Sequence, residues 1–190
     1  MGTRNLTMVQ VDGVLKVAQY GQWDGYPGGN GTVVLDFLRG LSREGEAQFA
    51  DKVRACHWVT PLERERLCEE SFGMHPSMTR DTGAGILAVI MASDGVPLFD
   101  QTGFAKDSLF CEWAYCVNLD DRTLEVYTGS NTSPVPEGQR FSDMEPNAAG
   151  VYNGTERYYP ITLLKTYSFD ELPTHHRLVT ECDPPEPDAA

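Results

Sequence analysis

Two apolar, β-branched runs open the chain and are separated by a two-residue turn. Residues 6–11 and 14–20 flank an Asp-Gly dipeptide at positions 12–13, and this dipeptide between such runs is a strong β-hairpin signal. A regular register from that turn pairs Val9 with Lys16, and both faces of the hairpin carry apolar side chains. We therefore predict a hairpin inside a sheet that is covered on both sides.

Three stretches downstream of the hairpin favour helices. Apolar side chains recur on one helical face over residues 32–41, and over 42–55 they lie opposite a charged face. The third stretch, 60–71, opens with Thr60 and has Glu63 three residues later. This spacing is a capping box, in which each side chain hydrogen-bonds the other residue's backbone N–H. It predicts that the third helix begins directly after Thr60.

Further strands are indicated by apolar runs in the second half of the chain. The run over 86–92 contains no polar residue, which is typical of a strand buried on both faces. A second hairpin is predicted to join 109–119 to 124–128. Its four-residue loop pairs Val117 with Val126 and so places apolar side chains opposite each other.

The whole pattern favours an α+β fold. With a last strand over 158–166, it consists of a mostly antiparallel sheet with an N-terminal hairpin and two to three helices packed on it. We expect a single domain over residues 1–172. Over 173–190 acidic side chains outnumber basic ones, and three prolines occur in the last seven residues. An acidic, largely disordered tail is therefore expected there.

The charge balance narrows the classes of partner. The 190 residues include 28 Asp and Glu against 15 Lys and Arg, which gives a net charge of −13. Because nucleic acids and anionic membranes are bound through clustered Lys and Arg, we expect neither as a partner. An acidic surface could dock on a basic protein, although the same surface also serves solubility alone.

Location and metal content follow from other features. No stretch is apolar over the length of a membrane span, and residues 1–5 lack the apolar core of a secretory signal. Five cysteines without an export signal indicate a cytoplasmic protein with reduced thiols. Cys56, His57 and Cys68 come nearest to a zinc set, but their spacing does not support one. We expect no metal and no cofactor.

The glycine-rich segment from residue 19 to residue 31 is the candidate binding site. Its polar and aromatic side chains are Gln19, Gln22, Trp23, Asp24, Tyr26 and Asn30. Glycines let a ligand approach the backbone, rings stack on a planar ligand, and amides recognise its edges. The nucleotide-binding motifs, P-loop and GxGxxG, are absent from this segment. The alternative is a tight turn whose Trp23 and Tyr26 fill the core.

Catalytic candidates are fewer. Glu112 and Glu125 stand beside apolar strand residues, where a carboxyl group with a raised pKa could carry protons. Carboxylates on the solvent-exposed face of a hairpin are commoner than carboxyl groups that carry protons, and we favour that interpretation. A nucleophilic pair would combine His75 with Cys111 or Cys116.

Three segments of the sequence carry a family resemblance. They are Arg-Asn-Leu-Thr at 4–7, Lys-Val-Ala-Gln-Tyr-Gly-Gln-Trp-Asp-Gly-Tyr-Pro at 16–27 and Phe-Cys-Glu-Trp-Ala-Tyr at 110–115. Over about residues 3–172 the chain resembles a family of uncharacterised proteins from bacteria and their phages. The resemblance implies a bacterial or phage setting and marks 16–31 as the family signature. It implies no catalytic residue.

The order of elements resembles, at the level of fold, the N-terminal-nucleophile hydrolases. These enzymes also begin with a strand and a tight hairpin, followed by helices and further strands. The resemblance implies an N-terminal nucleophile, which Gly2 cannot supply. Thr3 could act only after cleavage had made it the first residue, with its own amine as the base.

Three functions follow from these features. The first is a cytoplasmic protein that binds a small polar or planar ligand in a pocket formed by the loop 19–31. The second is an acidic, phage-encoded interaction protein that blocks a basic host factor. The third is an amide hydrolase of the N-terminal-nucleophile type.

Overall fold

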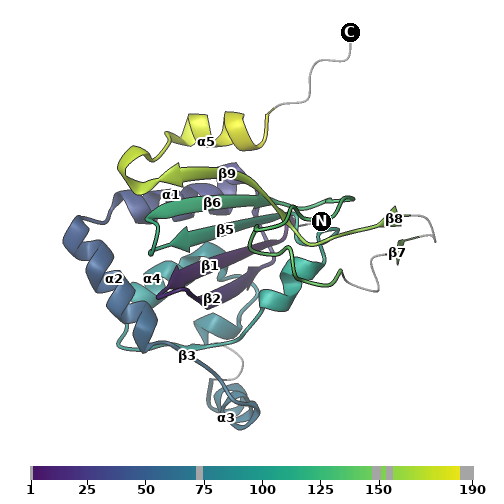
Figure 1. Cartoon of the computed structure of the whole chain (residues 1–190). Coiled ribbons are helices and arrows are strands. Elements are labelled where there is room, and N and C mark those ends of the chain that lie inside the picture. The colour runs from purple at the N-terminus through teal and green to yellow at the C-terminus, as the bar shows by residue number, and fades with distance from the viewer. Residues whose placement is uncertain (1, 72–74, 147–150, 153–155, 185–190) are drawn as a thin grey trace.

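A five-stranded sheet with strand order β2-β1-β5-β6-β9 forms the centre of the molecule (Figure 1). The computed structural model describes residues 2–71, 75–146, 151–152 and 156–184. The strands of this sheet are β1 (Asn5–Val11), β2 (Val14–Gly21), β5 (Trp113–Asn118), β6 (Thr123–Thr128) and β9 (Thr162–Ser168). Strands β1 and β5 run parallel and all other neighbours run antiparallel. The sheet is therefore mixed and mostly antiparallel, which confirms the predicted fold class.

The N-terminal hairpin forms at the predicted turn but departs from the regular register. A β-bulge at Lys16 pairs Val9 with Val17, where the regular register pairs Val9 with Lys16. The extra residue brings two fully buried valines opposite each other on the face that the helices cover. Lys16 stays half-exposed. Burial of the apolar pair thus outweighs the regular register.

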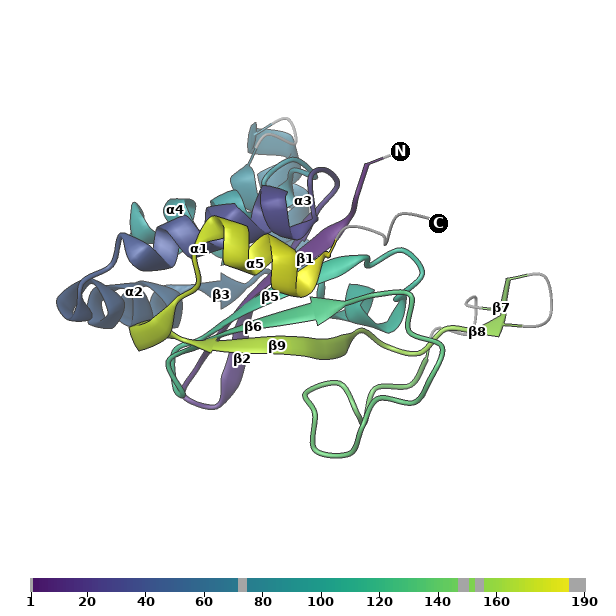
Figure 2. The same cartoon turned by 90° about the horizontal axis from the view of Figure 1, so that it is seen from above.

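Helices cover one face of the sheet, as the two views show (Figures 1 and 2). The structure describes five α-helices, more than the predicted two to three. They are α1 (Thr32–Arg39), α2 (Arg43–Ala55), α3 (Pro61–Ser71), α4 (Ile86–Met91) and α5 (His175–Cys182). Buried side chains of α1, α2, α4 and α5 join one apolar core with β1, β2, β5 and β6. Helix α3 stands away from this layer (Figure 1).

The capping box at the start of α3 is confirmed. The backbone N–H of Thr60 donates to Glu63 Oε2 at 2.8 Å, and the N–H of Glu63 donates to Thr60 Oγ1 at 3.3 Å. Helix α2 has a single side-chain cap, Ser42, whose hydroxyl accepts from the N–H of Gly45 at 3.1 Å. Local side-chain chemistry therefore fixes where both helices begin.

The strand predicted over 86–92 is wrong, because this run forms helix α4. Ile86, Leu87 and Ile90 are fully buried, while Ala88 is exposed. A short apolar run does not by itself distinguish a buried strand from a buried helix. Here α4 lies against α1 and α2 over the sheet. The run therefore supplies part of the helical layer.

The second hairpin and the last strand also differ from their predicted positions. Val117 pairs with Leu124, and the strand ends at Asn118, whose side-chain oxygen accepts from the backbone N–H groups of Asp120 and Asp121. This cap moves the four-residue loop one position toward the N-terminus. Strand β9 begins after Pro160, which has no N–H for a sheet ladder.

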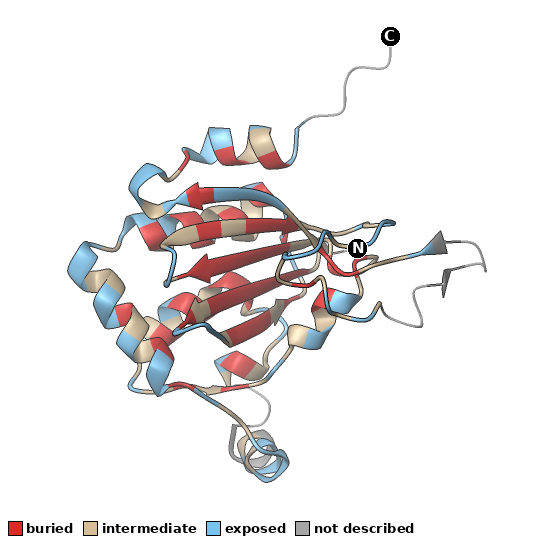
Figure 3. Cartoon of the chain, in the orientation of Figure 1, coloured by how far each residue is buried: buried red, intermediate tan, exposed pale blue. Residues whose placement is uncertain are grey.

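The second face of the sheet is covered by loops, so the prediction of a sheet covered on both sides is confirmed. Strand side chains such as Leu6 and Met8 pack there against Ala105, Phe141 and Ile161. Figure 3 shows that residues along the central strands are buried. Two short ribbons complete the fold, formed by β3 (His57–Trp58) with β4 (Pro97–Leu98) and by β7 (Val151–Tyr152) with β8 (Glu156–Arg157).

The expected disordered tail over 173–190 is wrong in its first part. Residues 175–182 form α5, and Leu178 and Cys182 are buried against the helical layer. These two residues are four positions apart and so share one helix face. Residues 185–190 lie outside the described residues. Within the described ranges, no helix combines the length and apolarity that crossing a bilayer requires.

Candidate functional site

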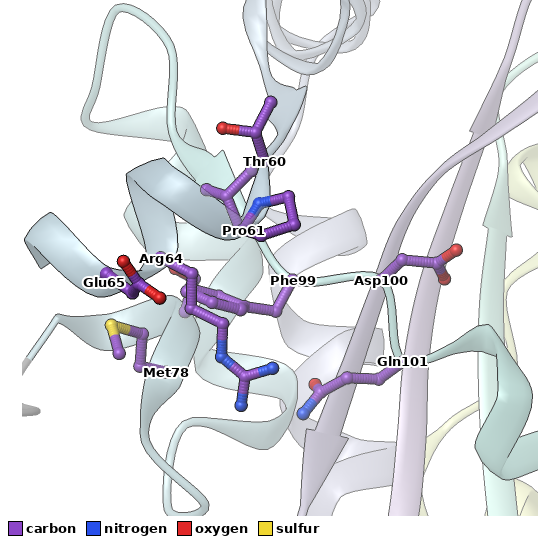
Figure 4. A pocket seen from close by; sticks show the side chains of 10 residues that line it. Thr60, Pro61, Arg64, Glu65, Met78, Phe99, Asp100 and Gln101 are labelled. Carbon is purple, nitrogen blue, oxygen red and sulfur yellow. The ribbon is translucent and has the colours of Figure 1, made fainter. Parts of the chain in front are cut away.

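Two neighbouring hollows lie beside the edge strand β2, and we call them together the edge groove. The larger hollow is a cleft of about 850 Å³. It is lined by Val59, Thr60, Pro61, Arg64, Glu65, Ser77, Met78, Phe99, Asp100 and Gln101 (Figure 4). The smaller hollow, of about 520 Å³, is lined by Gln22, Trp23, Met78, Thr79, Arg80 and Asp81. Met78 lines both hollows. The cleft has the size of a small-molecule site.

The β3–β4 ribbon positions the two walls of the cleft. It brings the start of α3 beside the segment 97–101, and the N–H of Val59 donates to the carbonyl of Leu98 at 2.9 Å. The capping box then starts α3 at a defined residue, so that Arg64 lies one turn inside the helix. Its guanidinium stacks over the ring of Phe99 at 5.6 Å from the centroid.

The segment 75–82 forms the floor between the two hollows and is fixed by hydrogen bonds. The buried Ser77 hydroxyl donates to the carbonyl of Pro97 at 2.6 Å. Gln19 Nε2 donates to the carbonyl of Thr79 at 3.4 Å. The backbone N–H of Gln22 donates to the carbonyl of Arg80 at 2.8 Å. The floor of the groove is thereby tied to the end of β2.

Two of the six predicted site residues line the groove. Trp23 is 53% exposed, and its indole Nε1 donates to Asp81 Oδ1 at 2.8 Å. Gln22 Oε1 accepts from the hydroxyl of Tyr20 at 2.6 Å and from Arg80 Nη2 at 2.5 Å. Trp23 and Gln22 therefore form one wall of the smaller hollow.

The other four predicted residues lie outside the groove lining. Gln19 is buried. The side-chain amide of Asn30 is hydrogen-bonded to backbone groups of the protein. Asn30 Nδ2 donates to the carbonyls of Trp23 and Asp24, and Asn30 Oδ1 accepts from the N–H of Ala84 at 2.8 Å. Tyr26, which is 41% exposed, lines neither hollow. The alternative in which Trp23 and Tyr26 fill the core is wrong, because both rings are exposed.

The glycines of this segment serve contacts within the chain. A Cβ atom at Gly25 would lie 2.8 Å from the carbonyl oxygen of Thr3, and one at Gly29 would lie 2.2 Å from that of Asp24. The backbone is thus folded tightly upon itself at these points. The glycine-rich composition reflects this close approach of backbone to backbone.

Sequence reasoning missed most of the groove lining. Arg64, Met78, Arg80, Phe99 and Gln101 come from three separate segments, and none belongs to a recognisable motif. The capping box at residues 60–63 predicted where α3 begins. It carried no information on what that helix faces.

Glu125 does not have the raised pKa expected of a proton carrier. Burial would raise the pKa of its carboxyl group, but hydrogen bonds from Tyr127, Asn118 and Arg140 outweigh that effect and hold the pKa below its ordinary value. The side chain of Glu125 is only 12% exposed, so the interpretation that it lies on a solvent-exposed face of the hairpin is also wrong. The Glu112 carboxylate accepts from the backbone N–H of Arg4 at 3.1 Å.

The proposed cysteine nucleophiles are wrong as well. Burial raises the pKa of Cys116 to about 12 and that of Cys111 further, so both remain thiols. His75 instead contacts Ser77, with Nδ1 and Oγ 2.7 Å apart, and desolvation lowers its pKa. Because the Ser77 hydroxyl is buried and donates to Pro97, this pair is structural. Among the described residues, no group of three or more His, Cys, Asp or Glu is arranged to hold a metal ion.

Comparisons of the chain with protein-family models, with curated proteins and with solved structures gave no match. The resemblances to the bacterial and phage family and to the N-terminal-nucleophile hydrolases therefore stay predictions. The geometry of the edge groove is the basis for a functional proposal.

Proposed function

We propose that the protein binds a small polar ligand with a planar or apolar body in the edge groove. The observation that carries this proposal is the cleft of about 850 Å³ with its mixed lining. Small-molecule sites typically combine apolar walls with a few placed polar groups. Val59, Pro61, Met78 and Phe99 supply the apolar surface, and Gln101 is among the polar groups.

The support for a formed site comes from how its walls are held. The capping box orients α3, the ribbon holds 97–101, and Ser77 is fixed to Pro97. A cavity whose lining is positioned before binding loses less conformational entropy when a ligand enters. The arrangement thus favours a binding site over a gap between loosely placed segments.

The other two functions drawn from the sequence stay predictions. The net charge of −13 is compatible with a basic protein partner, but no particular contact in the described structure favours one. For amide hydrolysis, Thr3 would have to become the first residue. In the described structure the backbone of Thr3 is held by a contact within the chain, because its carbonyl oxygen accepts from the N–H of Gly25 at 2.9 Å.

A ligand screen against a filled-groove variant tests the proposal. We expect at least one member of a metabolite panel to raise the unfolding temperature of the wild type in a saturable manner. In the variant Met78→Trp the indole should occupy the space that Met78 lines in both hollows and abolish that shift. Tyr26→Ala removes an exposed ring outside the groove and should leave the shift unchanged. A panel without any hit, or a shift that survives Met78→Trp, would contradict the proposal.

A further inference from the structure

The amide of Gln101 is oriented by the backbone of β2. Its Oε1 accepts the N–H of Tyr20 at 2.6 Å, and only the oxygen of an amide can accept. Its Nε2 is therefore the group left for other contacts, and among the described residues it has no partner. Since Gln101 lines the cleft, this wall presents a hydrogen-bond donor.

Arg64 supplies a second donor to the same cleft. Its guanidinium stacks on Phe99 and forms no ion pair with any carboxylate of the described residues. Figure 4 shows the guanidinium of Arg64 and the amide of Gln101 directed toward the same end of the cleft, which both residues line. The two carboxylates of the lining lie elsewhere. Asp100 points away from this end, and Glu65 lies beside Met78.

The smaller hollow repeats the pattern. Gln22 Oε1 is occupied by the Tyr20 hydroxyl and by Arg80, which leaves its Nε2 as a donor. Arg80 stacks over the ring of Tyr20 at 5.8 Å, and Asp81 Oδ1 is occupied by the Trp23 indole. The side-chain oxygen of Gln22, to which Arg80 donates, is thus used within the protein.

We propose that the edge groove recognises an oxyanion, the carboxylate or phosphate group of its ligand, between the guanidinium of Arg64 and Nε2 of Gln101. This inference rests on the proposed function and adds the chemical class of the ligand. Hydrogen bonds between a guanidinium and an oxyanion are charge-assisted and stronger than neutral ones. Stacking on Phe99 also holds the guanidinium in place, so less rotamer entropy is lost on binding. The apolar wall then receives the remainder of the ligand.

Three probes of similar shape test the donor pair: benzoate, phenyl phosphate and the neutral benzamide. Binding is measured by ligand-observed NMR titration at constant ionic strength. We expect benzoate, phenyl phosphate or both to bind the wild type, and benzamide to bind at least about ten-fold more weakly. A preference between the two anions distinguishes a carboxylate site from a phosphate site.

Two variants and one control locate the oxyanion. Gln101→Glu keeps the oxygen that accepts from Tyr20 but replaces the free donor with a negatively charged acceptor, so the backbone contact survives and anion binding should fall about ten-fold or more. Arg64→Gln should have the same effect. Arg66→Gln removes an equal charge from the same helix outside the groove lining and should leave binding unchanged. Circular dichroism melts confirm that each variant is folded.

The other outcomes distinguish failure of the oxyanion inference from failure of the proposed function. Equal binding of benzamide and benzoate, or anion affinities unaffected by Arg64→Gln and Gln101→Glu, would overturn the oxyanion inference and leave the groove as a ligand site. Failure of all three probes while other panel members bind in a manner blocked by Met78→Trp would do the same. Failure of every panel member would overturn the proposed function itself.

Discussion

Thr7 lies in an interior strand of the sheet, and its buried hydroxyl forms no hydrogen bond with the described residues. Its side chain in β1 is fully buried. The neighbouring strands place Gln19 and Tyr115 beside it. Asn5, two residues earlier on the same face, likewise has a buried and unpaired Oδ1. Unsatisfied groups of this kind cost free energy of folding.

Replacing Thr7 with valine should stabilise the protein. Valine has nearly the same shape and removes the unpaired hydroxyl, so the free energy of unfolding should rise by about 1 kcal/mol. The matched control is Thr79→Val. The Thr79 hydroxyl contacts that of Thr82 at 2.8 Å, and its loss should destabilise. Urea unfolding of the two variants measures the difference. A Thr7→Val protein that is less stable than the wild type would contradict this account.

Arg140 fastens the loop over 130–146 to the second face of the sheet. Its guanidinium donates to both oxygens of Glu125, at 3.0 and 2.8 Å, and also to Gln10. Tyr127 donates its hydroxyl to the same carboxylate at 2.5 Å. Both charged side chains are mostly buried, so removing one partner leaves the other charge uncompensated.

The ion pair between Glu125 and Arg140 should make the free energy of unfolding depend on pH in the acid range. The pKa of Glu125 is lower in the folded than in the unfolded chain, so its ionised form contributes stability at neutral pH, and this contribution is lost as the pH falls through the folded-state pKa. Glu125→Gln should cost about 3 kcal/mol near neutral pH and show a smaller loss on acidification. Glu137→Gln, on an exposed part of the same loop, should behave as the wild type. Urea unfolding at several pH values decides between these outcomes. Identical acid profiles for the wild type and Glu125→Gln would refute the assignment.

At the scale of the whole molecule, the fold needs both ends of the chain. Strand β1 near the N-terminus is an interior strand of the sheet, and α5 near the C-terminus covers part of its helical face. The two apolar cores lie on opposite faces of the sheet. The edge groove forms only when β2, α3 and the segments 75–81 and 97–101 meet.

Leu178→Ala should therefore destabilise the whole domain. A fully buried leucine that is truncated to alanine leaves a cavity, and the expected cost is about 3 kcal/mol. His176→Ala changes an exposed residue of the same helix and should have little effect. Thermal unfolding compares the two. Equal unfolding temperatures for Leu178→Ala and the wild type would indicate that α5 is not part of the cooperative unit.

Local chemistry made several elements predictable. The Asp-Gly turn of the first hairpin and the caps Ser42 and Thr60 involve residues a few positions apart, so their hydrogen bonds can be inferred from spacing alone. The run 86–92 forms a helix where the sequence predicts a strand, because a short apolar segment is compatible with either until its neighbours are known. Likewise, the bulge at Lys16 is decided by what covers the sheet.

The sequence by itself determined the turn of the first hairpin, the starts of α2 and α3 and the α+β class, because short-range hydrogen bonding and hydrophobic periodicity act between near neighbours. It also singled out Gln22 and Trp23, which line the smaller hollow. Only the tertiary structure decided that Arg64, Phe99 and Gln101 line one cleft. It also decided that the side chain of Asn30 hydrogen-bonds to the backbone and that helix α5, residues 175–182, packs on the core. Those contacts join segments far apart in the chain, and packing of the complete sheet and its helices brings them together.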